Sequence, residues 1–90
     1  MKVIDTTKFP LRDHNPKPRF WHLATVIDGI REYMAFWDAL EDKVYIERFS
    51  GYSMVEIENE EYQQVEPFLR ERGIFIEPLI PLELYHAYYS

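Results

Sequence analysis

The sequence contains no cysteine and only three glycines. The absence of cysteine excludes disulfides, iron–sulfur clusters and zinc sites built on thiolates. So few glycines also argue against a glycine-rich loop that would cradle a phosphate group. No nucleotide fingerprint of any kind is present, and we therefore expect no cofactor.

Long apolar runs are also missing. The stretch that begins at Met1 and Lys2 has neither the apolar core of a signal peptide nor the length of a membrane span. We therefore expect a cytoplasmic protein that contacts no membrane.

Recognisable catalytic and metal-binding motifs are lacking. None of the serines lies in a Gly-x-Ser-x-Gly elbow, no two histidines share i, i+4 spacing, and the acidic residues do not follow an EF-hand pattern. We expect His22 to be a structural residue of a strand and His14 to lie in a proline-rich loop. The sequence thus predicts no enzyme and no metal site. A small-ligand-binding protein or an enzyme, working through these histidines or the carboxylates, stays open as a third possibility.

The negative charge of −6 is distributed unevenly. Residues 1–19 carry five basic and two acidic side chains, residues 20–72 carry five basic and twelve acidic ones, and residues 73–90 add two glutamates. A predominantly acidic body argues against direct nucleic-acid binding, because contacts to phosphate depend mainly on Lys and Arg.

Aromatic side chains are abundant, at 17% of the sequence with seven tyrosines. Seven of the fifteen aromatic residues lie in residues 20–49, a stretch that is organised around Asp28-Gly29. A two-residue Asp-Gly loop suits a type I′ turn, since Asp and Gly tolerate the positive φ angles that this turn requires. Such a turn predicts a β-hairpin in which Trp21 lies opposite Phe36.

The pattern predicts strands at residues 20–27, 30–37 and 43–49, with a short fourth strand at 53–57. Residues 30–40 also fit the spacing of an amphipathic helix, which is the alternative for that segment. Both faces of the hairpin are apolar away from the turn, whereas a sheet with one wet face alternates apolar and polar residues. Each face of the sheet must therefore pack against another part of the chain or against another molecule.

A helix is predicted from Glu60 to about Arg72. Asn59 is the expected N-cap, and Gly73 follows the helix at the position where glycine commonly ends one. Pro67 lacks the N–H that a helix interior requires, so a kink or a break into two short helices is expected.

The last part of the chain is apolar and rich in tyrosine. Residues 74–76 are expected to be extended, and a short final helix is expected to begin at Pro81. We expect the tyrosine-rich tail to dock on the second sheet face or on another molecule.

Together these elements predict an α+β fold in one small domain, residues 20–90. Its core is a three- or four-stranded antiparallel meander with one kinked helix on one face and an aromatic C-terminal tail. Residues 1–19 are expected to form an extended basic arm, because they contain three prolines, and residues 2–5 are a candidate for a short strand within it.

An excess of aromatic residues without a catalytic constellation is typical of a protein-binding module. We therefore predict a non-catalytic protein–protein interaction module, a small regulator, inhibitor or accessory protein that also forms homo-oligomers. The expected contact residues are the tryptophans and selected tyrosines: Trp21, Tyr33, Trp37, Tyr85, Tyr88 and Tyr89.

The alternative function rests on the acidic residues. A dense row of carboxylates can imitate the phosphates of a nucleic acid and thereby inhibit a DNA- or RNA-handling protein. The acidic surface expected for such a mimic comprises Glu56, Glu58, Glu60 and Glu61.

Overall fold

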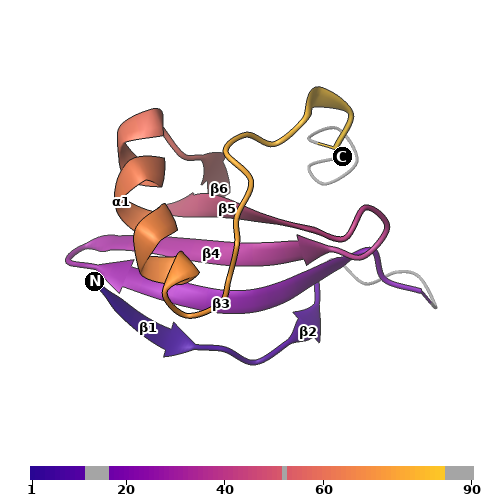
Figure 1. Cartoon of the computed structure of the whole chain (residues 1–90), viewed down its shortest axis with the longest axis horizontal. Helices are drawn as coiled ribbons and strands as arrows, with labels where there is room; N and C mark the ends of the chain where they lie inside the picture. The colour runs from indigo at the N-terminus through magenta and orange to yellow at the C-terminus, as the bar shows by residue number, and fades with distance from the viewer. Residues whose placement is uncertain (12–16, 52, 85–90) are drawn as a thin grey trace.

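A computed structural model describes residues 1–11, 17–51 and 53–84 of the chain (Figure 1). Its strands and its one long helix follow in this order along the chain: β1 (Lys2–Asp5), β2 (Phe9–Pro10), β3 (Phe20–Asp28), β4 (Arg31–Asp38), β5 (Lys43–Ser50), β6 (Ser53–Glu56) and α1 (Asn59–Arg70). The fold is α+β, as predicted.

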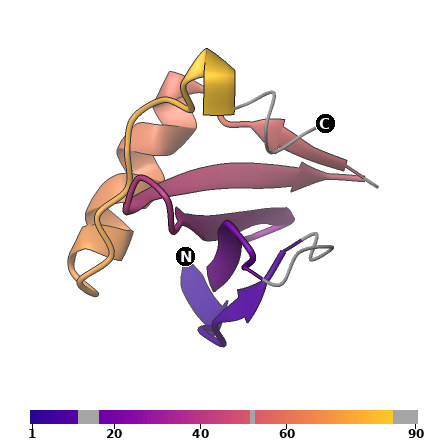
Figure 2. The ribbon, with the colours of Figure 1, turned by 90° about the vertical axis from the view of Figure 1, so that its right-hand side faces the viewer.

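The sheet is larger than the predicted three- or four-stranded meander. In the described part of the chain six strands form it, in the order β1-β3-β4-β5-β6, and β2 pairs with β3 beside β1. The two additional strands come from the N-terminal segment, where Pro10 lies in the sheet only because β2 is at an edge. Figure 2 shows β1 and β2 at the side of the sheet remote from β6.

The turn of the central hairpin differs from the prediction by one residue on each strand. Asp28 pairs with Arg31, so the loop consists of Gly29 and Ile30 rather than Asp28 and Gly29. Gly29 has φ 62°, while Asp28 and Ile30 have no positive φ. Positive φ at the first loop position alone is the pattern of a type II′ turn, not of the predicted type I′ turn.

A β-bulge then changes the register within β3. Ala24 pairs with Ala35, but His22 pairs with Phe36, so Leu23 is an extra residue without a counterpart on β4. An extra residue reverses which side chains point to each face beyond it. As a result Trp21 pairs with Trp37, not with Phe36 as predicted.

Two separate hydrophobic clusters fill the two faces of the sheet. Consecutive residues of a strand point to opposite faces, and Ala35 belongs to one cluster while Phe36 belongs to the other. Val65 and Leu69 of α1 pack in the first cluster, and Leu84 packs in the second. Figures 1 and 2 show α1 lying along one side of the twisted sheet.

Helix α1 begins one residue earlier than predicted, with Glu58 rather than Asn59 as its N-cap. Glu58 and Glu61 form a capping box, in which each side chain accepts a backbone N–H of the other residue. Glutamate at the third helical position favours this start, so Asn59 lies within the first turn.

The end of α1 follows the prediction more closely. Gly73 has φ 79°. The N–H of Gly73 donates to the carbonyl of Arg70, and the N–H of Ile74 donates to the carbonyl of Leu69. This pair of bonds is a Schellman motif with glycine at its left-handed position. The helix is continuous through Pro67, so the predicted break into two helices does not occur.

Candidate functional site

The two tryptophans form a cross-strand pair at the end of the hairpin remote from the turn. Trp21 of β3 and Trp37 of β4 are direct register partners, and Trp37 pairs in turn with Val44 of β5. Both indole side chains are half-buried. They therefore combine an anchored ring with an accessible surface, which is the usual state of an aromatic contact residue.

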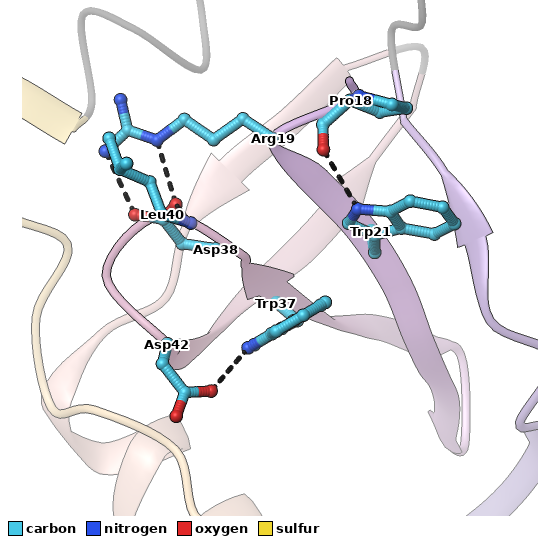
Figure 3. A network of polar contacts seen from close by, with 7 residues as sticks. All are labelled: Pro18, Arg19, Trp21, Trp37, Asp38, Leu40 and Asp42. Carbon is cyan, nitrogen blue, oxygen red and sulfur yellow. Dashed lines mark hydrogen bonds and ion pairs between the residues drawn. The ribbon is translucent and has the colours of Figure 1, made fainter. Parts of the chain in front are cut away.

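Hydrogen bonds fix the orientation of both indoles (Figure 3). The Nε1–H of Trp21 donates to the carbonyl of Pro18 at 3.0 Å. The Nε1–H of Trp37 donates to Oδ1 of Asp42 at 2.9 Å. Asp42 lies in the turn between β4 and β5 with φ 55°, a left-handed conformation that Asp tolerates better than most residues.

A lysine lies over the two rings. The Nζ atom of Lys8 is 4.1 Å from the ring centroid of Trp37 and 5.6 Å from that of Trp21. Both distances are within the range of cation–π attraction, and tryptophan is the strongest aromatic partner. Lys8 is exposed, so the interaction is worth about 0.5–1 kcal/mol.

The backbone around Lys8 is held by His22, which is 2% exposed. Nδ1 of His22 donates to the carbonyl of Thr7 at 2.6 Å, because a carbonyl can only accept. Nε2 then accepts from the hydroxyl of Thr25 at 2.8 Å in the neutral imidazole. The ring of Phe9 stacks on the imidazole at 4.4 Å. His22 is thus a structural residue that fixes the positions on both sides of Lys8.

An ion pair occupies the neighbouring start of β3 (Figure 3). The guanidinium of Arg19 donates from Nε and Nη2 to the two carboxylate oxygens of Asp38, at 2.8 and 3.0 Å. Asp38 is fully buried and also accepts the backbone N–H of Leu40 at 3.0 Å. The hydrogen bonds to Asp38 raise the pKa of Arg19 above its ordinary value. This bidentate pair is a structural clamp on the β4–β5 turn.

A pocket of about 430 Å³ opens beside this clamp. Its charged groups are largely paired with each other, since Arg19 bonds Asp38 and Lys43 lies 3.5 Å from Glu77. Tyr45 and Leu84 supply part of the apolar wall. The described lining residues include no serine, cysteine or histidine that could act as a nucleophile or as a general base near neutral pH.

Tyr33, the third predicted contact residue in the described part of the chain, lies elsewhere. Tyr33 is fully buried in the cluster beneath α1, so its side chain contributes to the core and presents no surface to a partner. Tyr85, Tyr88 and Tyr89 lie outside the described residues. Among the predicted contact residues that the structure describes, Trp21 and Trp37 are therefore the two that it brings together.

Glu61 of the predicted acidic surface is also inside the protein, at 3% exposure. Its oxygens accept from the hydroxyl of Tyr33 and from Nη1 of Arg48, both at 2.8 Å. Burial opposes ionisation, but the bonds from Tyr33 and the Glu58 N–H and the charges of Arg48 and Arg31 outweigh it, so the pKa of Glu61 is lowered. Glu56, Glu58 and Glu60 are exposed.

Sequence reasoning missed the lysine over the tryptophans and the Arg19–Asp38 clamp. In the sequence, Lys8 is one of the basic residues of the expected arm, and Asp38 lies between the strands expected at residues 30–37 and 43–49. Neither role can be recognised until the register places Trp21 beside Trp37 and Phe20 beside Asp38. The sequence feature that points toward these two interactions is the basic character of residues 1–19, which precede an acidic body.

Comparison with family models, with curated proteins and with solved structures finds no match for this chain. Among the described residues, no group of three or more His, Asp or Glu side chains is arranged to hold a metal ion. No helix in that part of the chain has the length and apolar character needed to cross a bilayer.

Proposed function

We propose that this protein is a non-catalytic protein-binding module, a small regulator, inhibitor or accessory protein that contacts its partner through the tryptophan pair. The observation that carries the proposal is the pair itself: two half-buried indoles, side by side, with both N–H groups fixed by hydrogen bonds. Pre-oriented tryptophans lose little conformational freedom on binding, and they are over-represented among the residues that dominate interface energies.

Exposed apolar side chains in the segment after α1 give additional support. Phe75, Leu79 and Leu82 are 67%, 70% and 71% exposed, although they are large and hydrophobic. Exposed apolar groups of this size are common at protein interfaces. The described pocket, by contrast, holds charges that are largely paired, which favours a structural role over chemistry.

The proposal can be tested by capturing partners from an extract of the source cells on the immobilised protein. We expect Trp37→Ala to weaken capture of a specific partner by more than tenfold, since a contact tryptophan is often worth about 2 kcal/mol or more. The matched control is Phe49→Ala, because Phe49 is also an exposed aromatic residue of the sheet, at 42% exposure. Circular dichroism would verify that both variants fold.

The same assay separates this function from nucleic-acid mimicry. Capture through a surface that imitates nucleic acid should weaken as salt is raised, since charge contacts are screened within about 10 Å at 0.1 M salt, and duplex DNA should compete with it. Capture through the tryptophans should persist as salt is raised and should not be competed by duplex DNA. The acidic variant should reverse only the exposed Glu56, Glu58 and Glu60, because Glu61 is needed in the core. If that variant alone lost binding while Trp37→Ala remained competent, the mimic would replace our proposal.

A further inference from the structure

We propose that the tryptophan pair is a receptor for the ammonium group of a lysine side chain on the partner protein, and that Lys8 occupies this receptor in the free protein as an internal competitor. This inference rests on the proposed function and specifies what the partner presents. It follows from the way in which the two rings and Lys8 are held.

The rings are arranged to bind a cation on their faces. Each indole has its N–H edge engaged, Trp21 with the Pro18 carbonyl and Trp37 with the Asp42 carboxylate. The faces of both rings are within cation–π distance of the same Nζ atom, at 4.1 and 5.6 Å. The bond to a carboxylate also increases the electron density of the Trp37 ring, which favours a cation over its face. Two fixed rings that share one ammonium are the essential part of an aromatic cage.

The cation that occupies the cage is weakly held. Among the described residues the ammonium of Lys8 forms no salt bridge, whereas Arg19, Arg31, Arg48 and Lys43 each face a carboxylate. Lys8 is also exposed, so water competes for its ammonium group. A lysine supplied by a partner would be removed from water on binding, and cation–π attraction strengthens when the cation is desolvated.

Displacement of Lys8 does not require the fold to open. The carbonyl of Thr7 is bonded to His22 and the ring of Phe9 is stacked on the same imidazole, so the backbone on both sides of Lys8 is anchored. Only the flexible four-carbon stem of Lys8 has to move. The cage already accepts an ammonium on an unbranched alkyl chain, which is the chemistry of another lysine, with or without methyl groups on the nitrogen.

The inference is tested by titrating the full chain with small probes. Nα-acetyl-lysine methylamide and its Nε-trimethyl form are added to wild type and to Lys8→Ala, and the ¹H–¹⁵N signals of the two indole N–H groups are followed. We expect Lys8→Ala to bind the trimethyl probe with a saturable shift and at least fivefold more tightly than wild type. The matched control is Lys2→Ala, since Lys2 is exposed but pairs with Ile27, near the turn of the hairpin. It should bind as wild type does.

Two further probes determine whether binding needs the ammonium charge and whether it needs the lysine side chain. Nα-acetyl-norleucine methylamide, which lacks the ammonium group, should produce no saturable shift. Choline should bind no more tightly than the trimethyllysine probe. Equal binding of the lysine probes by Lys8→Ala and wild type, no saturable shift in Lys8→Ala, or binding of choline alone would each overturn the inference.

Partner capture distinguishes failure of this inference from failure of the proposed function. We expect Lys8→Ala to capture the Trp37-dependent partner more strongly than wild type does. If capture depends on Trp37 but Lys8→Ala changes neither capture nor probe binding, the proposed function stands and the ammonium receptor is wrong. If Lys8→Ala binds the probes while no protein is captured in a Trp37-dependent way, the ammonium site stands and the proposed function is wrong.

Discussion

Glu61 shows how one residue of this protein serves two structural purposes. Its carboxylate takes part in the capping box at the start of α1, and it accepts hydrogen bonds from Tyr33 of β4 and Arg48 of β5. The helix is thereby attached to two strands through a single buried charge. Such a charge is stable only while its partners are present, since an unpaired buried ion carries a large desolvation cost.

We expect Glu61→Gln to lower the free energy of unfolding by about 2–3 kcal/mol at pH 7, because Arg48 then loses its buried counter-charge. The pKa of Glu61 is lowered in the folded protein. Its contribution is therefore present above the unfolded pKa of about 4.3 and is lost as the pH falls through the folded value. Urea unfolding of wild type and variant between pH 7 and pH 3 measures this difference.

Tyr33→Phe provides the comparison, because it removes one hydrogen bond to Glu61 and leaves the charge in place. Its cost should be smaller, about 1–2 kcal/mol. A difference between wild type and Glu61→Gln that stayed the same down to pH 3 would contradict the ionised state of Glu61.

The sequence placed Glu61 correctly in the first turn of a helix but wrongly on a solvated surface. The local pattern of acidic residues explains the first result, since negative charge favours a helix N-terminus. The second depends on partners 13 and 28 residues away in the chain. Local spacing carries no information about such distant contacts.

At the scale of elements, the prediction of two strands for the central hairpin is confirmed by β3 and β4. The alternative helix over residues 30–40 is wrong, because β4 spans Arg31–Asp38. Its register could not be derived. Compared with the predicted pairing, the displaced turn moves the partner of each β3 residue two positions along β4. The bulge at Leu23 moves the partners of the residues before it back by one position. Only the combination of both irregularities places Trp21 beside Trp37, so the candidate site could not be found from alternation alone.

We expect Gly29→Val to destabilise the protein by more than about 1 kcal/mol, since a β-branched residue resists the φ of 62° at this position. For a domain of this size that loss lowers the melting temperature by about 4–8 °C or more. Thermal unfolding followed by circular dichroism measures the shift.

The matched control lies in the same loop. Ile30 is fully exposed and has no positive φ, so Ile30→Asn should leave the melting temperature nearly unchanged or raise it slightly. If Gly29→Val melted at the same temperature as wild type, Gly29 would not be the position that forms the turn.

For the whole molecule, the apolar residues on both faces of the hairpin predicted that another segment packs against each face of the sheet. The structure has one hydrophobic cluster on each face, the first beneath α1 and the second including Ile80 and Leu84. The prediction succeeded because burial of apolar surface is the main favourable contribution to folding, whichever segment supplies the cover. A short strand at residues 2–5 is compatible with the sequence and corresponds to β1, but the two-residue β2 and the pairing of both strands with β3 were not predicted.

We expect the protein to self-associate at micromolar concentration, because large apolar side chains remain exposed after folding. Sedimentation equilibrium should show species heavier than the 10.9 kDa chain. Leu79→Lys with Leu82→Lys should shift the population toward the single chain if these exposed residues form the contact. Detection of the 10.9 kDa species alone for the wild-type protein would exclude self-association under these conditions.

The outer side of β1 has a consequence for how this aromatic-rich sheet behaves in a crowded solution. β1 is only four residues long, its register is irregular between Val3 and Asp5, and β2 beside it ends in Pro10. A second chain that tried to extend the sheet here would find few consecutive backbone partners, and proline offers no donor. We therefore expect strand-by-strand growth into fibrils to be disfavoured at this edge.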